Sequence, residues 1–255
     1  MRRFSNRNNK NSLIDERSFL QGPHDRFKEF LFTLKVQYHF IKSFRKLHFV
    51  GPCVTVFGSA RFESSNLFYK KAEEVGVALA KLGFTVMTGG GPGIMEAANK
   101  GAYESGGYSV GCNIVLPEEQ NPNPYLHKWI KIPYFFLRKF LLMKYSYAFI
   151  VMPGGIGTLD ELFEALTLIQ TKMIKHFPVV IFGKDYHKEL YHHILLMAKN
   201  ESIDEEDMKL LFITDSIAEM VAHLNIHAVK KFGLTKKPYK IKWWFAETQQ
   251  PDSVK

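Results

Sequence analysis

The sequence predicts an α/β fold in which a parallel β-sheet carries helices on both faces. From residue 53 onward, short apolar runs alternate with longer segments whose apolar residues recur every three or four positions. The runs are continuously apolar, as expected of strands that are buried on both faces. Glycine turns follow three of these runs. Such turns lie at the carboxyl end of a parallel sheet, where ligands bind.

Each element follows from its own pattern. Apolar residues at helical spacing predict a first helix at 25–48. We expect strands at 53–57, 85–87, 109–115, 129–132, 148–152 and 179–182. We expect the later helices at 67–82, 94–103, 134–144, 158–173, 187–199 and 216–231. Residues 211–214 can form a last short strand or part of a loop, and residues 116–125 contain too many Pro and Asn for a regular element.

These elements divide the chain into a basic extension with an amphipathic helix at 1–48, an α/β domain at 49–232 and a tail at 233–255. The net charge is +9, and residues 1–50 contain eleven Lys or Arg against four Asp or Glu. No recognition motif accompanies this charge, so we expect no nucleic-acid partner. The helix is expected to pack on the main domain or on a partner subunit. A membrane-surface position is an alternative that the acids on its polar face disfavour.

The sequence also bears on the compartment. No apolar run approaches the length of a membrane span, and no apolar core of secretory length follows the basic N-terminus. Cys53 and Cys112 fall in expected strands and form no metal-type pair. We expect buried thiols in a reducing compartment, and therefore a cytoplasmic protein without a membrane partner.

The stretch from residue 147 to residue 164 organises the predicted site. Its apolar strand stops at Pro153, three glycines follow (Gly154, Gly155 and Gly157), and Thr158 opens a helix. Backbone N–H groups at such a turn and helix N-terminus suit a phosphate. Glu161 then places a carboxylate within one turn of that anion, which predicts a catalytic group beside a phosphate grip. The alternative is a capping box, in which Thr158 caps the helix and Glu161 bonds back to the Thr158 N–H.

The glycine turn at 89–93 excludes several chemistries. It does not match the dinucleotide fingerprint, because residue 94 is Ile, and it lacks the Gly-Lys-Ser/Thr of a triphosphate loop. No acid is aligned for magnesium or for a ribose, which argues against phosphoryl transfer and against a nicotinamide cofactor. Nothing identifies a Schiff-base lysine for pyridoxal phosphate. We therefore expect no cofactor and no metal.

Arg138 is the candidate partner for Glu161. It interrupts an apolar stretch, so its charge must be paired or face a cleft. The alternative is a surface arginine whose stem covers apolar area. Other acids on these helices, Glu96, Asp160 and Glu164, are more often solvated. The remaining candidates are histidines without ligand spacing, which we interpret as structural: His187, His192, His193, His223 and His227.

Three motifs together resemble the LONELY GUY (LOG) family over about residues 50–230: Gly89-Gly90-Gly91-Pro92-Gly93-Ile94-Met95-Glu96, Arg138-Lys139, and Pro153-Gly154-Gly155-x-Gly157-Thr158-x-x-Glu161. Members are cytokinin riboside 5′-monophosphate phosphoribohydrolases, often mislabelled as lysine decarboxylases. The resemblance implies a Rossmann-like domain and a homodimer. It also implies hydrolysis of the N-glycosidic bond of a nucleoside 5′-monophosphate, AMP or N6-modified AMP, to free base and ribose 5-phosphate.

The resemblance also implies the site residues. Arg138 and Glu161 correspond to the catalytic pair. The expected substrate-binding residues are Ser59, Gly90, Gly91, Gly93, Met95, Glu96, Lys139, Gly154, Gly155, Gly157 and Thr158. Many members have Met-His where this chain has Phe135-Phe136, and the basic arm and the 116–125 loop also differ from the short plant-like form. The base preference and the physiological role therefore stay open.

A binding protein is the rival interpretation. The same fold resembles carriers of the molybdenum cofactor, which hold a phosphate without turnover. There, Glu161 would be a helix cap and Arg138 a ligand contact. The presence of both residues favours the hydrolase, in which Glu161 stabilises the positive charge that develops on the ribose. We expect Arg138 to keep Glu161 ionised, because a neighbouring cation favours the charged form.

Overall fold

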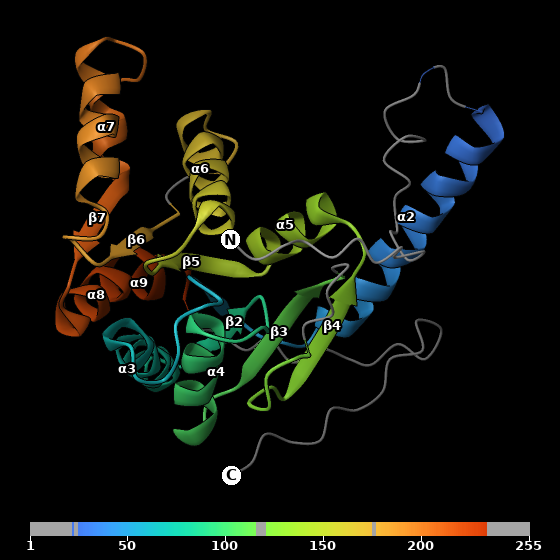
Figure 1. The fold of residues 1–255 in the computed structure, drawn as a ribbon, viewed down its shortest axis with the longest axis horizontal. Coiled ribbons are helices and arrows are strands. Elements are labelled where there is room, and N and C mark those ends of the chain that lie inside the picture. Colours follow the sequence, from blue (N-terminus) through green and yellow to red (C-terminus); the bar gives the residue numbers. More distant parts are fainter. Residues whose placement is uncertain (1–21, 23–24, 116–120, 175–176, 234–255) are drawn as a thin grey trace, which may run out of the picture.

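The computed structural model describes residue 22 and residues 25–115, 121–174 and 177–233. Within them, seven strands form one sheet in the order β4-β3-β2-β1-β5-β6-β7 (Figure 1). All six neighbouring pairs are parallel, which confirms the predicted fold class. The central strand β1 (Cys53–Phe57) pairs with β2 (Thr85–Thr88) on one side and with β5 (Ser146–Val151) on the other. The strand order reverses there, which opens a crevice at the carboxyl ends.

The outer strands extend the sheet from this centre. They are β3 (Ser109–Ile114), β4 (Lys128–Ile132), β6 (Val179–Phe182) and β7 (Leu211–Thr214). β1, β2 and β6 are buried along their whole length, and β5 is buried at every residue except Tyr147, as expected of strands covered on both faces. Residues 211–214, for which the sequence left strand or loop open, are paired with β6 and form the edge.

Helices cover both faces of the sheet (Figure 1). α3 (Leu67–Lys81), α4 (Ile94–Glu104) and α8 (Ile217–Leu224) pack on one face around a buried core that includes Val54, Val86 and Ile150. α5 (Phe135–Lys144), α6 (Ile156–Gln170) and α7 (Lys188–Lys199) lie on the other face. The two predicted layers are therefore confirmed.

Two helix boundaries differ from expectation. α6 begins at Ile156 rather than at residue 158, because Gly155 is extended and its carbonyl already accepts bonds from the N–H groups of Thr158 and Leu159. The helix expected at 216–231 is interrupted. A π-helical stretch at Asn225–Val229 separates α8 from α9 (Lys230–Phe232). Residues 205–210, for which we expected no element, form a 3₁₀ helix (Glu205–Leu210) before β7.

The N-terminal helix α2 (Arg26–Leu47) reaches beyond the β4 edge of the sheet (Figure 1). Its C-terminal end belongs to the domain, since Ser43 and Leu47 are buried and Phe40 and Phe44 contact Phe140 of α5. Its N-terminal half is exposed. The expected packing on the main domain therefore holds for part of the helix.

Other expectations fall partly outside the described residues. Residues 1–21 and 234–255 lie there, so the three-part division of the chain stays a prediction. Cys53 and Cys112 are buried free thiols, as predicted. Among the described helices, none has the length and apolar character needed to cross a lipid bilayer.

Candidate active site

Three glycine turns meet at the carboxyl end of β1, β2 and β5, where Ser59 joins them. The Ser59 N–H donates to the Pro153 carbonyl at 3.0 Å, and the Ser59 carbonyl accepts from the Ile94 N–H at 2.9 Å. The Ser59 hydroxyl accepts a third bond, from the Arg61 N–H at 3.1 Å. The expected binding residue Ser59 therefore positions the turns before α4 and α6 relative to each other.

The turn after β2 needs its glycines for steric reasons. Gly90 and Gly93 have φ values of +72° and +71°, where a side chain is strained. A Cβ atom at Gly90 would also collide with the buried Asn113 side chain. Asn123 braces the turn, since its N–H donates to the Gly90 carbonyl at 2.9 Å and its side chain donates to the Gly91 carbonyl at 3.1 Å.

Asn123 lies in the 116–125 loop, for which the pattern predicts no regular element, so the sequence analysis missed its role. A run rich in Asn and Pro indicates only a turn.

The turn after β5 leaves room for a ligand. Gly154 has no space for a side chain, because a Cβ atom there would collide with the Thr158 hydroxyl. Gly155 and Gly157, in contrast, are exposed and have nothing within 4 Å of a Cβ position. They form the open N-terminus of α6, with free N–H groups and the positive end of the helix dipole. Tyr186 supports the turn from the far side by donating to the Gly154 carbonyl at 2.9 Å.

The capping-box alternative for Glu161 is wrong. Gly155, not Thr158, is the N-cap residue of α6, and no side chain caps the helix. Thr158 is the third helical residue and Glu161 the sixth, so the Glu161 side chain lies a full turn beyond the position of a capping acid.

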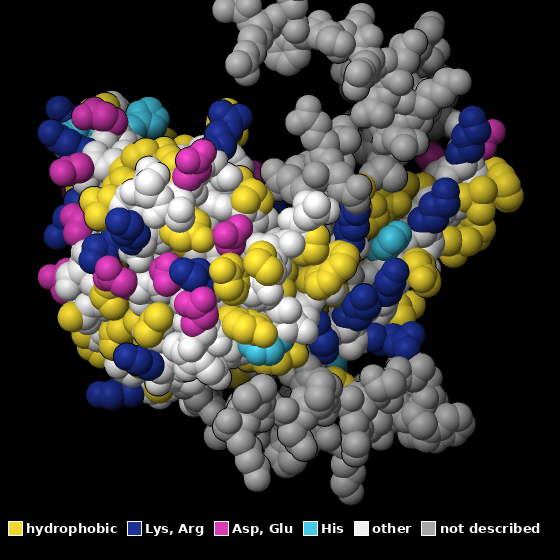
Figure 2. Space-filling model, turned by 60° about the horizontal axis from the view of Figure 1, so that its bottom comes forward, with side chains coloured by type: hydrophobic (Ala, Val, Ile, Leu, Met, Phe, Trp, Pro, Cys, Tyr) yellow, Lys and Arg dark blue, Asp and Glu magenta, His cyan; other side chains and the backbone are white. Residues whose placement is uncertain are grey.

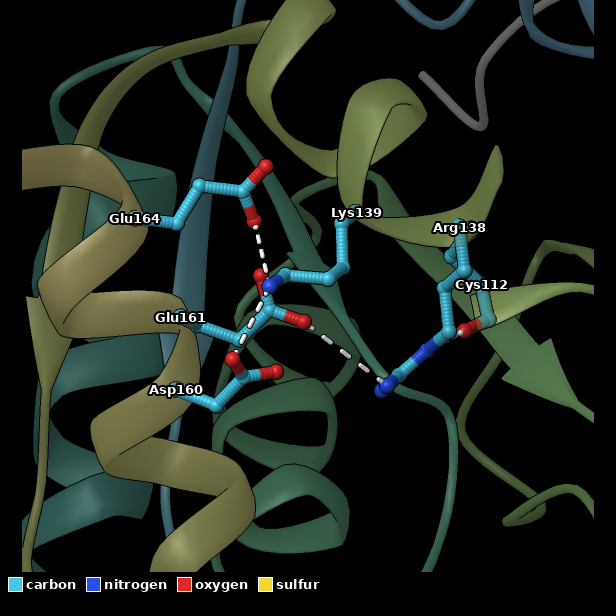
Figure 3. A network of polar contacts seen from close by, with 6 residues as sticks. All are labelled: Cys112, Arg138, Lys139, Asp160, Glu161 and Glu164. Carbon is cyan, nitrogen blue, oxygen red and sulfur yellow. Dashed lines mark hydrogen bonds and ion pairs between the residues drawn. The ribbon is translucent and has the colours of Figure 1, made fainter. Parts of the chain in front are cut away.

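Arg138 of α5 and Glu161 of α6 point toward each other (Figure 3). Arg138 Nη1 lies 3.9 Å from Glu161 Oε1. Arg138 Nε donates to the Cys112 carbonyl at 2.9 Å, so the end of β3 fixes the guanidinium. The Arg138 side chain is 15% exposed and that of Glu161 6%, which excludes the surface arginine as an interpretation. A Cβ atom at Gly89 would collide with Arg138, so the guanidinium reaches the turn after β2.

Glu161 has the pKa of a group that can exchange protons near neutrality. Burial raises its pKa to about 7, and this outweighs the opposing effect of Arg138. Glu164 and Asp160 raise the pKa further, and Lys139 lowers it. The expectation that Arg138 keeps Glu161 ionised is therefore corrected, because at 3.9 Å the cation compensates only part of the lost hydration.

Lys139 is paired with two carboxylates. Its Nζ lies 2.9 Å from Asp160 Oδ1 and 2.9 Å from Glu164 Oε2, so it holds α5 against α6 (Figure 3). Asp160 and Glu164 remain partly solvated, with side chains 52% and 33% exposed, but both contact Lys139. The role of Lys139 as a substrate contact stays a prediction.

Two further expected binding residues lie on the first turn of α4. The Met95 sulfur lies beside Gly89, where a Cβ atom would collide with it. Glu96 Oε1 accepts a hydrogen bond from Tyr69 at 3.1 Å. Among the described residues, no cluster of three or more His, Cys, Asp and Glu is arranged to hold a metal ion. The arrangement brings together an anion-binding helix N-terminus, a fixed guanidinium and a buried carboxyl.

Solved structures share this fold. The molybdenum cofactor binding protein from Rippkaea orientalis aligns with a TM-score of 0.53 and 22% identity, over 69% of this chain and 96% of that one. The molybdenum cofactor carrier protein of Chlamydomonas reinhardtii aligns with a TM-score of 0.52 and 23% identity, over 69% and 98%. At these identities the likeness shows the fold alone.

Curated relatives match in sequence. The cytokinin riboside 5′-monophosphate phosphoribohydrolase LOG of Oryza sativa subsp. japonica is 28% identical over 184 residues, or 71% of this chain and 74% of the rice protein. The enzyme of that name from Mycobacterium tuberculosis is 40% identical over 101 residues, 38% and 52% of the chains. The pyrimidine/purine nucleotide 5′-monophosphate nucleosidase of Escherichia coli is 27% identical over 156 residues, 56% of this chain but 34% of the relative.

A family model described as "Possible lysine decarboxylase" matches residues 95–224, about half of the chain. The matched segment begins at Met95 and contains Arg138, Lys139 and the whole turn from Pro153 to Glu161. The family named by this model and the family of the phosphoribohydrolase relatives are one. The chain belongs to the LONELY GUY (LOG) family.

Proposed function

We propose that this protein hydrolyses the N-glycosidic bond of nucleoside 5′-monophosphates, AMP or N6-modified AMP, to free base and ribose 5-phosphate. The observation that carries the proposal is the buried Glu161 carboxyl, with a pKa of about 7, facing Arg138 beside an open helix N-terminus. Relatives named as phosphoribohydrolases and as a nucleotide nucleosidase support it.

The phosphate anchors the substrate. The exposed N–H groups around Gly155 and Gly157 suit its charge, and Thr158 and Ser59 form the walls of that turn. The phosphate takes no part in the reaction, so its binding energy can hold the ribose in a reactive position. Gly90, Gly91, Gly93, Met95 and Glu96 then line the side of the crevice toward β2, as proposed contacts of the remainder of the nucleotide.

Glu161 acts on the ribose. As the bond between C1′ and the base nitrogen breaks, its electron pair leaves with the base and positive charge develops on the ribose ring. The Glu161 carboxylate stabilises that charge and accepts a proton from the water that adds to C1′. The base nitrogen takes up a proton from solvent. Arg138, held by the Cys112 carbonyl, orients Glu161 and the substrate.

We also propose that the protein works as a homodimer, as the resemblance implied, and that it does so in the cytoplasm, as the expected buried thiols indicated. Neither point enters the reaction scheme above, and each is testable by itself: the assembly by light scattering and the compartment by cell fractionation.

The test is to incubate the purified protein with AMP and, separately, with N6-modified AMP without added metal, and to separate the products by chromatography. We expect free base and ribose 5-phosphate from the wild type. Glu161→Gln should lose about 2–4 orders of magnitude in kcat, the scale of a general acid–base group. The matched control is Glu104→Gln, which removes an exposed carboxylate at the end of α4 and should retain full activity.

The rates with the two substrates rank the bases. Wild-type turnover in Glu161→Gln would remove this carboxyl from the mechanism. If no monophosphate is cleaved while binding is still detectable, the carrier interpretation replaces the hydrolase, and bound pterin or molybdenum in the purified protein would support it.

A further inference from the structure

Asn113, at the carboxyl end of β3, is a buried amide without a hydrogen-bond partner. Its side chain is 4% exposed, and its Oδ1 atom accepts no hydrogen bond. No hydrogen bond joins its nitrogen to another residue in the part of the chain that the structure describes. Buried polar groups are nearly always bonded, and an orphaned one costs free energy. Such a group indicates a partner that enters with a ligand.

Neighbouring side chains show that the protein satisfies buried amides in this region. Asn99 Oδ1 accepts from Thr88 Oγ1 at 2.5 Å and from Asn123 Nδ2 at 3.0 Å. Asn99 Nδ2 donates to Ser109 Oγ at 2.7 Å. The Thr88 hydroxyl also accepts from the Gly90 N–H at 2.8 Å. The unbonded amide of β3 therefore lies beside a network whose own amides are bonded.

The Asn113 amide faces the turn after β2. Successive side chains of a strand point to opposite faces. Cys112 belongs to the core under α5 and α6, so Asn113 points to the face that α4 covers, where it meets Gly90. A Cβ atom at Gly90 would collide with Asn113 Oδ1, and one at Gly89 would collide with Arg138. Arg138 is held by the Cys112 carbonyl (Figure 3). The amide and the guanidinium thus border consecutive residues of one turn.

The position of the amide selects the base as the part of the nucleotide that meets it, a step that rests on the function proposed above. There, the phosphate binds at the turn after β5, and the bond to be cleaved lies at Arg138 and Glu161. The strands run in the order β3-β2-β1-β5, so the end of β3 is on the far side of the crevice from the phosphate turn. The base lies across the cleaved bond from the phosphate, and it therefore extends toward Asn113.

Charge does not distinguish one base from another. The excess of Lys and Arg attracts nucleotides through their phosphates. Figure 2 shows a row of these side chains along α2, which reaches beyond the β4 edge of the sheet. The bases are uncharged, and they are read by hydrogen-bond donors and acceptors. An amide offers a donor and an acceptor side by side.

We propose that Asn113 reads the base through N6 and N7 of a 6-aminopurine. Adenine presents an N6–H donor beside the N7 acceptor, a pair with which Asn forms two hydrogen bonds. Oδ1 accepts from N6–H, and Nδ2 donates to N7. The terminal torsion of an Asn side chain is broad, so the amide can turn from Gly90 toward the base.

This contact defines which bases fit. A 6-oxopurine presents two acceptors at the same edge, so one of them always meets the amide oxygen. One N6–H remains when N6 carries a single substituent, so N6-modified AMP keeps both hydrogen bonds. A second substituent on N6 removes the donor.

The first test measures binding, so that it does not depend on turnover. Calorimetric titrations use the full-length Glu161→Gln variant, in which slow hydrolysis leaves the ligand intact. We expect AMP and N6-methyl-AMP to bind alike, and roughly 10-fold or more tighter than IMP, the discrimination typical of a two-bond Asn contact. N6,N6-dimethyl-AMP, which has no N6–H, and 7-deaza-AMP, which has no N7, should each lose part of that affinity.

The second test separates a base contact from a structural amide. In the same Glu161→Gln background, Asn113→Leu replaces an orphaned polar group by an apolar one of similar size, so the melting temperature should stay unchanged or rise. The affinities for AMP and IMP should come within about threefold of each other. The matched control is Asn99→Leu, which breaks a bonded buried amide. It should lower the melting temperature and retain the preference for AMP over IMP.

Two results would overturn the proposal: equal affinity for AMP and IMP while Asn113 is present, or an unchanged ratio of the two affinities in Asn113→Leu. A lower melting temperature together with a uniform loss of affinity in that variant would assign the amide a structural role. Failure of the proposed function is a different outcome, in which the wild type cleaves no monophosphate. The titrations then still test the base contact, and a chain that binds none of these nucleotides would end both proposals.

Discussion

Glu161 combines near-complete burial with a position facing a cation. Because the pKa of this carboxyl is about 7, a small change in pH or in the neighbouring charges decides whether it is neutral or ionised. In the free enzyme, kcat/KM reports the pKa of an essential group. The carboxylate form is needed to stabilise the ribose cation and to accept a proton. We therefore expect kcat/KM for AMP to rise with pH through a midpoint near 7.

Glu164 gives this pH dependence a specific test. Its negative charge raises the Glu161 pKa, so Glu164→Gln should move the midpoint to lower pH. Glu104→Gln, far along α4, should leave the midpoint in place. The range from pH 5 to pH 9 covers about two units on each side of the midpoint. If kcat/KM for AMP is constant over this range, the ionisation of Glu161 does not control the reaction.

The same carboxyl should also limit stability at high pH. Its folded-state pKa, about 7, lies above the ordinary value of 4.5, so its folded form favours the proton. That contribution is fully present below pH 4.5 and is lost as the pH rises through 7. Glu161→Gln should therefore become more stable than the wild type above pH 7, by roughly 1–3 kcal/mol. Urea unfolding at several pH values measures this, and an equal difference at pH 5 and pH 9 would contradict it.

At the scale of elements, Lys139 couples α5 to α6. Lys139→Met removes two ion pairs made by a largely buried lysine, one to the exposed Asp160 and one to the partly buried Glu164, and we expect a loss of roughly 1–2 kcal/mol in the free energy of unfolding. It also leaves two unpaired carboxylates beside Glu161, so the midpoint of the pH profile should move to higher pH, opposite to Glu164→Gln. Lys139→Arg should restore most of both properties. A midpoint that moves down in Lys139→Met would refute this coupling.

The glycines of the two turns should respond differently to the same substitution. Gly90→Ala forces a side chain into a positive φ and against Asn113, at a cost of about 1–3 kcal/mol in stability. Gly155→Ala meets no neighbour and has a negative φ, so stability should change by less than about 0.5 kcal/mol. Its methyl group would instead face the proposed phosphate, and KM for AMP should rise roughly tenfold.

Thermal melts and steady-state kinetics of the two glycine variants separate these effects. If Gly155→Ala retains the wild-type KM for AMP, the phosphate does not bind at this turn.

At the scale of the whole molecule, α2 belongs to the domain at its C-terminal end. Leu47 is fully buried among residues of the sheet, α5 and α6. Leu47→Ala should therefore cost about 2–5 kcal/mol, as a large-to-small change in a core does. Leu195→Ala on the exposed side of α7 should cost less than about 0.5 kcal/mol. Urea unfolding compares the two variants. Equal unfolding midpoints would show that Leu47, and with it the end of α2, does not belong to the core.

The sequence alone determined the sheet, the covering layers and the three glycine turns. Continuous apolar runs between amphipathic segments can be buried only as strands of a parallel sheet, and parallel strands bring their carboxyl ends to one edge. The residues near that edge could be named for this reason. Boundaries were less certain, because glycine turns allow a helix to begin at more than one residue, as α6 does at Ile156.

Only the tertiary structure decided which side chains meet. Arg138 and Glu161 are on different helices, and the 3.9 Å between them depends on how α5 and α6 pack on the sheet. The pKa of Glu161 depends on burial, which outweighs the cation, and no local pattern reports burial of one residue. The ion pairs of Lys139 likewise join two helices that are remote in sequence. The packing also decides which apolar residues of α2 stay exposed. Local patterns fix the elements because their physics is local, whereas a site depends on distances that only the packed chain sets.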